Sequence, residues 1–333
     1  MLEMHPTAAL FEREAWANMR LIEFCAKQPE DVLTGASGDD VMGPVDKQLA
    51  HIVSGGAVIL PWVTEERWSG EVIADLPVDK LQAPMEWVAE RWSRAMDFDR
   101  DPEEVYQFQG RRGPVDMTSW KAILQYLHHG DDHRNQIATV LTRHEVVPPE
   151  LDVWSFGDAV GSERPEAAPE RRERRDAILR RAFGHHAWAT QTLLAACTEL
   201  SPEQLAMTAT GTYGSILDTL DHMISADRSY LSRLRGTGRK PPLQAGALEP
   251  LSEELARTAE GWLSYLDSKP DFDAAIDLRD GTTVGAWVIV AQAIHHGNDH
   301  RTHTTTTMMH NGLPIPDLDP WEYSKAVATG QPA

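Results

Sequence analysis

Apolar residues recur three or four positions apart in several stretches of the first 150 residues, which is the spacing of one face of an α-helix. Thr7 is a suitable N-cap for the first stretch, and Pro61 should kink or end the second. Asp116 or Thr118 should cap the fourth. The pattern predicts four helices, at residues 8–26, 43–61, 84–96 and 118–143.

The segment between the third and fourth predicted helices has a different pattern. Residues 105–108 do not follow helical spacing, and the segment Gly110-Arg-Arg-Gly113-Pro114 follows them. Glycine and proline at such positions mark turns. We therefore expect a short hairpin or a long loop here.

The second half of the chain repeats the pattern of the first. The matched pairs, with their separations, are Trp16 and Trp188 (172), His51 and His222 (171), and His133 and His300 (167). A slowly changing separation is typical of a duplicated domain with small loop deletions. The fold class predicted is all-α, with two tandem four-helix bundles related by a pseudo-two-fold axis.

A charged segment with two prolines separates the halves. Residues 159–174 carry Pro165 and Pro169 among many Glu and Arg residues, as expected of a linker that runs into a helix. We expect a four-helix domain at residues 1–158, the linker at 159–174 and a second domain at 175–333. In the second domain, residues 250–268 should form the third helix, 273–280 the irregular stretch, and Thr282 or Thr283 the cap of the fourth helix.

Composition limits the classes of partner. The formal net charge of −20 argues against nucleic acid or an anionic membrane as the main partner, and it favours solubility. With only Cys25 and Cys197, the chain has neither a disulfide framework nor a Cys-rich zinc site. No signal peptide is visible, and the most apolar stretch, 284–294, is too short to span a bilayer. We expect a cytoplasmic monomer that is a pseudo-dimer within one chain and binds a small-molecule substrate.

Histidines form the most informative motif. His129 and His133 are four residues apart, as are His296 and His300, so each pair shares a helix face. The alternative is a pair of half-buried histidines that pack under a helix, but the repetition of the pattern favours a metal. Adding one histidine from each second helix gives three candidate ligands per half: His51, His129 and His133, then His222, His296 and His300.

Three neutral imidazoles would leave one position of a tetrahedral Zn²⁺ open, as catalytic sites do. Ni²⁺, Fe²⁺ or Mn²⁺ also accept such ligands. We therefore expect one divalent metal per domain, with Zn²⁺ favoured.

A single histidine on the second helix, followed by His-xxx-His-Arg on the last helix of a four-helix bundle, resembles the DinB family, the DinB/YfiT-like metalloenzymes. The chain looks like two tandem copies of such a domain. The resemblance implies that each set of three histidines binds one divalent metal. Some members of this family are transferases that use a bacterial low-molecular-weight thiol, such as bacillithiol or mycothiol, so the resemblance also points to that activity. Members often show His-His-Arg-Gly-Gln, where this chain has Asp132 and Asp299 in place of the first His.

Other residues near the motif have two interpretations each. Asp132 and Asp299 are either acceptors that orient imidazole groups or part of a solvated helix face. Arg134 and Arg301 either hold an anionic substrate group or pair with carboxylates. Ser54 and Ser225 either leave room for substrate or lie at tight helix contacts. His303 is a fourth ligand of the second half, or it lines a pocket in the place that Gln136 has in the first.

Three functions compete. The first is a metal-dependent transferase that places a low-molecular-weight thiol on an electrophile, because a metal lowers the pKa of a bound thiol. The second is a metal-dependent hydrolase that activates water. The third is a metal-binding stress-response protein without turnover. Since the sequence offers no separate nucleophile with its base, all chemistry should pass through the metal, and the resemblance favours the transferase.

Overall fold

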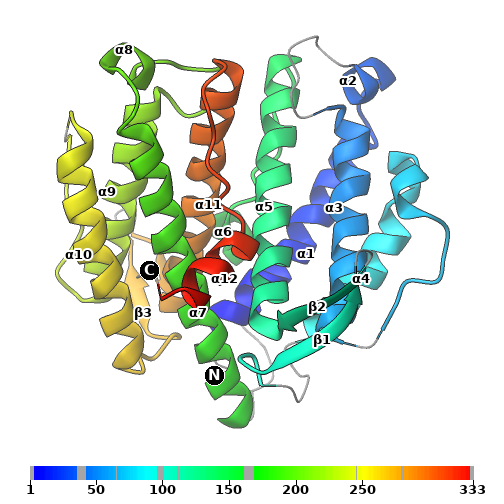
Figure 1. Ribbon diagram of the computed structural model, residues 1–333, viewed down its shortest axis with the longest axis horizontal. Helices are drawn as coiled ribbons and strands as arrows, with labels where there is room; N and C mark the ends of the chain where they lie inside the picture. Colours follow the sequence, from blue (N-terminus) through cyan, green and yellow to red (C-terminus); the bar gives the residue numbers. More distant parts are fainter. Residues whose placement is uncertain are drawn as a thin grey trace.

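The computed structural model describes residues 4–35, 43–64, 66–95, 101–110, 113–160, 169–244, 246–278 and 281–330. Within these ranges the protein is mostly helical, as the sequence predicts (Figure 1). None of the described helices is long and apolar enough to cross a membrane.

Four long helices from the first half pack against one another on the right of Figure 1. The helix α3 lies against both α4 and α5, and α1 covers the other side of the same two helices. A short helix, α2 (Glu30–Thr34), and three 3₁₀ turns connect them. The long helices are α1 (Pro6–Cys25), α3 (Val45–Ile59), α4 (Gln82–Ala95) and α5 (Ser119–Arg143).

Four further long helices pack together on the left of Figure 1. Here α9 and α11 have the most extensive contact, and α10 lies against α7 and α9. The one-turn helix α8 (Pro202–Leu205) follows α7. The long helices are α7 (Pro169–Cys197), α9 (Ile216–Leu234), α10 (Leu248–Asp267) and α11 (Ala286–His310).

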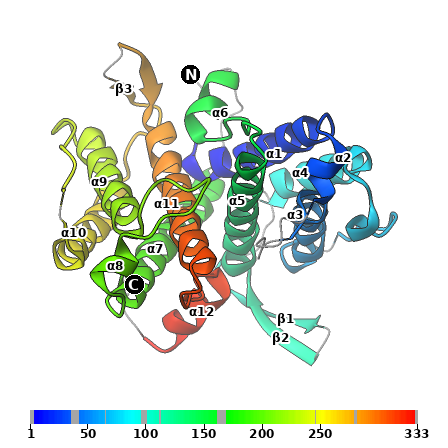
Figure 2. The same ribbon diagram turned by 90° about the horizontal axis from the view of Figure 1, so that it is seen from above.

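One antiparallel hairpin precedes the last long helix of each group. β1 (Val105–Gly110) pairs with β2 (Gly113–Thr118), with Val105 opposite Thr118. This hairpin extends away from the helices when the molecule is seen from above (Figure 2). β3 (Ala275–Asp277) pairs with β4 (Thr283–Gly285) in the corresponding place before α11.

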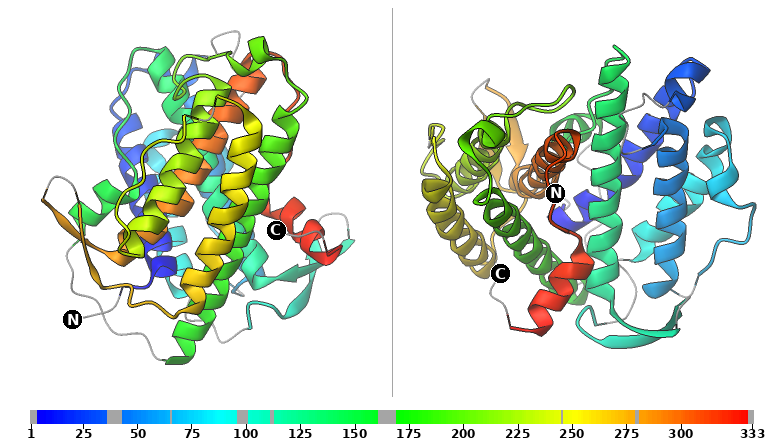
Figure 3. Two further views of the ribbon diagram at one scale, coloured as in Figure 1. Left: turned by 90° about the vertical axis from the view of Figure 1, so that its left-hand side faces the viewer. Right: turned by 45° about the horizontal axis from the view of Figure 1, so that its top comes forward.

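The two groups of helices share a large apolar core. α5 and α11 lie side by side in the middle of the molecule (Figures 2 and 3), and α1 also contacts α11. Two short helices fill the angles between the groups: α6 (Val153–Ala159) packs on α1 and α11, and α12 (Pro320–Ala328) packs on α5 and α7. One large cluster of buried side chains therefore draws on both groups and includes Phe156 and Val288, while a second, smaller cluster lies among α7, α9, α10 and α11 and includes Leu193 and Met308.

A buried tryptophan fixes the helix that carries the single histidine in each group. Trp92 on α4 donates its indole N–H to the carbonyl oxygen of Gly56 on α3, at 3.0 Å. Trp262 on α10 donates to the Oδ1 atom of Asp227 on α9, at 2.8 Å. Because an indole N–H needs a partner when it is buried, each hydrogen bond also fixes the axial position of one helix relative to its neighbour.

Several boundaries differ from the sequence-based predictions. The N-cap of α1 is His5, whose Nδ1 atom accepts from the backbone N–H of Thr7, so the predicted Thr7 cap was wrong. Helix α7 starts at Pro169, inside the predicted linker, of which residues 161–168 lie outside the described ranges. Thr283 belongs to strand β4, and Gly285 is the N-cap of α11. Periodicity also missed the short helices α2, α6, α8 and α12.

Candidate metal centres

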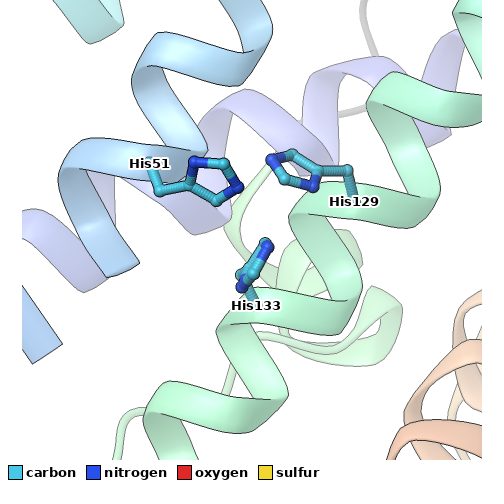
Figure 4. A group of neighbouring side chains, drawn as sticks. All are labelled: His51, His129 and His133. Carbon is cyan, nitrogen blue, oxygen red and sulfur yellow. The ribbon is translucent and has the colours of Figure 1, made fainter. Parts of the chain in front are cut away.

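The three histidines of the first half lie together. His51 comes from α3, while His129 and His133 come from successive turns of α5, and the three rings turn toward one another (Figure 4). Their ligand nitrogens all lie within 4.8 Å of one another. The ring centroids are 4.5–4.8 Å apart. We call this group the N-terminal triad.

The chemical state of the N-terminal triad suits a cation. Burial, with the neighbouring histidines His133 and His51, lowers the pKa of His129 to about 3, and burial also lowers the pKa of His133. Both rings are therefore neutral at pH 7, which is the form that binds a metal. The Nε2 atom of His129 and the Nδ1 atom of His133 are buried and have no hydrogen-bond partner in the described part of the chain.

Gly55 makes room for the His129 ring. A Cβ atom at position 55 would lie 2.6 Å from the Nε2 atom of His129, closer than van der Waals contact permits. The equivalent position on α9, 171 residues later (226 − 55), is Ala226. Of the six triad histidines, His129 is the only one whose ring an added Cβ at a described glycine would meet.

We expect Gly55→Ala to abolish metal binding at the N-terminal triad and leave the second site intact. The ring of His129 would have to swing away from the added methyl group, whereas alanine at a helical position favours the helix by about 1 kcal/mol over glycine. Metal analysis should show a loss of about one ion per chain, with little change in the unfolding of metal-free protein. Gly157→Ala is the control, since its Cβ would meet its nearest neighbour at an ordinary 3.6 Å. Full metal content in Gly55→Ala would contradict this role.

The second set of histidines forms a similar group, which we call the C-terminal triad. His222 comes from α9, and His296 and His300 come from α11. Their ligand nitrogens also lie within 4.8 Å of one another, and the Nε2 atoms of His222 and His296 are 3.1 Å apart. Burial, followed by repulsion from neighbouring histidines, lowers the pKa of His296 and of His300 well below the ordinary value.

A tyrosine outside the helices supports the C-terminal triad. The hydroxyl group of Tyr213 lies 3.0 Å from the Nδ1 atom of His222, and its ring stacks on the same imidazole. If Nδ1 carries the proton, it donates to Tyr213 and leaves Nε2 free to face the group. The predicted site residues did not include Tyr213, because it lies in a loop with no periodic signal.

Asp299 and His303 lie beside the C-terminal triad. Together with His300 they form a further group whose possible ligand atoms are within 4.8 Å of one another. The carboxylate oxygens of Asp299 are 3.9 Å from the Nε2 atom of His300 and 3.9 Å from that of His303. The two residues are therefore near His300, but His303 does not line the adjacent pocket described next.

A pocket of about 830 Å³ opens against the C-terminal triad, with His222 and His296 in its wall. Its other walls include Tyr213, Tyr230 and Ser225. A space of this size accommodates a small-molecule ligand. A position adjacent to the histidines is thus accessible to a ligand from this side.

The remaining predicted residues of the first half have structural partners. Asp132 accepts hydrogen bonds from the amide of Gln136 at 2.8 Å and from the hydroxyl of Thr302 on α11 at 2.7 Å, so its carboxylate connects α5 to α11. Asp132 and Gln136 both line a smaller cavity of about 350 Å³ between these helices. Ser54 donates to the carbonyl oxygen of His51 in its own helix, at 3.2 Å.

Arg134 is paired with carboxylates in the protein interior. Its guanidinium group binds both carboxylate oxygens of Glu14 on α1, at 2.6 and 2.5 Å, and Asp131 at 2.6 Å. The side chain is only 2% exposed. The hypothesis that Arg134 holds a substrate anion was therefore wrong, because the ionic partners of this side chain are already inside the core.

Arg301 is equally buried but has different partners. Its guanidinium group donates to the Nδ1 atom of His186 at 3.3 Å, to the hydroxyl of Thr190 at 3.0 Å and to the side-chain oxygen of Asn298. His186 occupies the place of Glu14 (186 − 14 = 172), and its Nε2 atom is 3.3 Å from Asp227. Burial lowers the pKa of Arg301 to about 10. This side chain is also structural and does not line the pocket at the C-terminal triad.

Both triads pass a simple test for a metal site. Each brings three imidazole nitrogens within 4.8 Å of one another, and the buried Nε2 atom of His129 and the buried Nδ1 atoms of His133 and His300 have no hydrogen-bond partner among the described residues. Buried polar atoms are almost always satisfied, so unpaired nitrogens within groups of three close imidazoles suggest that a cation belongs there.

Comparison with known proteins identifies a DinB family domain at residues 177–331. This range contains His222, His296 and His300. No curated protein and no solved structure matched the chain.

Proposed function

We propose that the protein is a divalent-metal-dependent enzyme that transfers a low-molecular-weight thiol to an electrophilic small molecule. The observation that carries this proposal is the C-terminal triad in the wall of an 830 Å³ pocket. The DinB domain at residues 177–331 adds support for metal binding.

We further propose that the chain is a tandem duplication, with bundles at residues 1–158 and 175–333 and one metal ion, preferably zinc, in each. Three sets of equivalent residues support it: the two triads, the pair Trp92 and Trp262, and the pair Gly130 and Gly297. An added Cβ at Gly130 would lie 1.8 Å from a Glu14 oxygen, and at Gly297 it would lie 2.2 Å from the His186 ring. In both halves the motif glycine thus lets a helix approach α5 or α11 closely. A cytoplasmic monomer remains our expectation.

The chain's own cysteines are unsuited to carry the sulfur chemistry. Cys25 and Cys197 are fully buried, and burial raises the pKa of Cys25 to about 12 and that of Cys197 to about 11. Both thiols are therefore protonated and inaccessible at neutral pH. The reacting sulfur must come from a small molecule.

A bound divalent metal would supply a positive charge that keeps the incoming thiol deprotonated. The protein's part is to hold the ligands and admit the thiol. Burial keeps His296 and His300 neutral, Tyr213 orients His222, and the pocket leaves the triad open on one side. In the transfer, the thiolate sulfur forms a bond to carbon, the leaving group departs with its electron pair, and the thiol proton goes to solvent.

The test is turnover with a panel of thiols and alkylating electrophiles, followed by mass spectrometry of the thioether product. We expect His296→Ala to lower the rate at least 100-fold, because it removes a ligand next to the pocket. In cobalt-substituted protein the right thiol should add a sulfur-to-metal absorption band that grows as pH rises, since the thiolate is the ligand. Ester or amide cleavage without any thiol-dependent band would replace the transferase by a hydrolase. No turnover of thiols with electrophiles, and none of esters or amides, would favour a non-catalytic metal-binding protein.

A further inference from the structure

One face of α9 forms a wall of the pocket beside the C-terminal triad. His222, Ser225, Ser229 and Arg233 follow one another at steps of three or four residues along it, and all four line the pocket. The rise of an α-helix separates His222 from Arg233 by about 16 Å along the axis. The pocket is therefore elongated, with histidines at one position and a cation farther along.

Two more cations reach the pocket from the loop after α9. Arg239 and Lys240 line it, and the loop folds back on the helix because Ser225 accepts a hydrogen bond from the backbone N–H of Leu243, at 2.8 Å. Arg228 adds a second tie by donating to the carbonyl oxygen of Pro241. Ser225 thus supports the pocket wall, a role that its position beside the ligand His222 did not reveal.

These three cations are distinctive in an acidic protein. The formal net charge is −20, yet Arg233, Arg239 and Lys240 all line one pocket. The same wall includes two carboxylates, Asp218 and Asp221, which accept hydrogen bonds from Ser215 at 2.6 Å and from Ser225 at 3.0 Å. Within the ranges that the structure describes, the charged side-chain groups of the three cationic residues have no ion-pair or hydrogen-bond partner. Cations without an internal partner beside a cavity suit a negatively charged ligand.

The first half has no corresponding cations. At the same spacing of 171 residues, Trp62 stands where α9 has Arg233, and Trp68 and Ser69 stand where the loop has Arg239 and Lys240. The triads are alike, but the surroundings that would select a ligand are not.

We propose that the C-terminal pocket selects an elongated thiol that carries a carboxylate or phosphate group distant from its sulfur, held by Arg233, Arg239 and Lys240. This inference rests on the proposed function for the identity of the reactive group, but the anion subsite can be tested without turnover. Guanidinium groups bind such anions with paired hydrogen bonds, and the lysine adds charge. The N-terminal triad lacks this preference.

The probe is glutathione, a tripeptide thiol with two carboxylates, titrated calorimetrically into metal-free and metal-loaded protein. Tripolyphosphate serves as an anion without sulfur, and glutathione diethyl ester as a thiol without carboxylate charge. We expect Arg233→Gln, and the double change Arg239→Gln with Lys240→Gln, each to weaken glutathione binding about 10-fold. The weakening should be the same without metal, and added salt should reduce it. Arg67→Gln with Lys80→Gln is the control for net charge, because both side chains are exposed away from the pocket.

Equal binding of glutathione by the wild type and both pocket variants would overturn the proposal, as would tighter binding of the diethyl ester. A wild-type protein that binds neither glutathione nor tripolyphosphate would also overturn the proposal. Cation-dependent binding in a protein that never forms a thioether would uphold the anion subsite and refute the transferase. If both pocket variants form the thioether at the wild-type rate, the transferase would be upheld and the anion subsite refuted.

Discussion

His133→Ala should lower the metal content of the purified protein from about two ions per chain to about one, and His300→Ala should do the same. The double variant should retain almost none. Each triad has three imidazole ligands from two helices. Removal of one imidazole leaves two, which are too few to hold the metal ion against a chelator. Elemental analysis after brief dialysis against a weak chelator measures the loss directly.

The same variants should separate the stabilities of the two halves. An ion bound only by the folded state stabilises it by about 2.7 kcal/mol when its concentration is 100 times the dissociation constant. His133→Ala should therefore abolish the stabilisation that metal gives to α3 and α5, and His300→Ala that given to α9 and α11, as hydrogen exchange of each helix would report. His310→Ala, an exposed histidine at the end of α11, should change neither quantity. One ion in the wild type, lost with only one of the two changes, would mean that the other triad is inactive.

The local part of the site could be predicted from sequence. The spacing of His129 and His133 places both on one face of a helix wherever that helix lies, because the relation depends only on helical periodicity. The repeat then indicated which histidine on the second helix should join them. The structure brings each set of three within 4.8 Å.

Relations that depend on helix packing could not be predicted. Arg134 lies in the repeated motif, but its partner Glu14 is 120 residues earlier on α1. Only the rotation of α1 about its own axis, with Gly130 admitting the Glu14 carboxylate, decides that the arginine points into the core. Nothing in the motif distinguishes this outcome from a substrate-binding arginine.

The positions of loop residues could not be predicted from the sequence for a different reason. Tyr213, Arg239 and Lys240 lie in segments without periodicity, and hydrogen bonds to α9 determine where Tyr213 and the loop after α9 lie. Arg233 was accessible in principle, because it is 11 residues after His222 and thus on the same helical face. Following the ligand face of α9 to its end would have found it.

The second large effect concerns the buried arginines. Arg134→Met in metal-free protein should lower the free energy of unfolding by about 3–5 kcal/mol, the cost of leaving a charge unpaired in the interior. Glu14 loses a bidentate partner and, among the residues that the structure describes, retains only the side-chain amide of Asn18, at 3.0 Å. Urea unfolding at pH 7 measures this, and adding Glu14→Gln to Arg134→Met should recover most of it, because a neutral amide is far cheaper to bury than a carboxylate.

Arg301→Met provides the matched comparison in the other half. Its described partners His186, Thr190 and Asn298 are not carboxylates, so no buried anion loses a direct ionic partner, and we expect a loss of less than about 2 kcal/mol. Acid should also distinguish the two variants, because only Arg134→Met leaves a buried carboxylate without its ionic partner. Burial without an ionic partner favours the neutral form of a carboxyl group, so the folded variant binds a proton more readily than the unfolded one, and the Arg134→Met deficit should shrink as pH falls from 7 to 5. Equal losses in both variants, with no relief in acid, would show that Arg134 stabilises the core by packing and not by its charge.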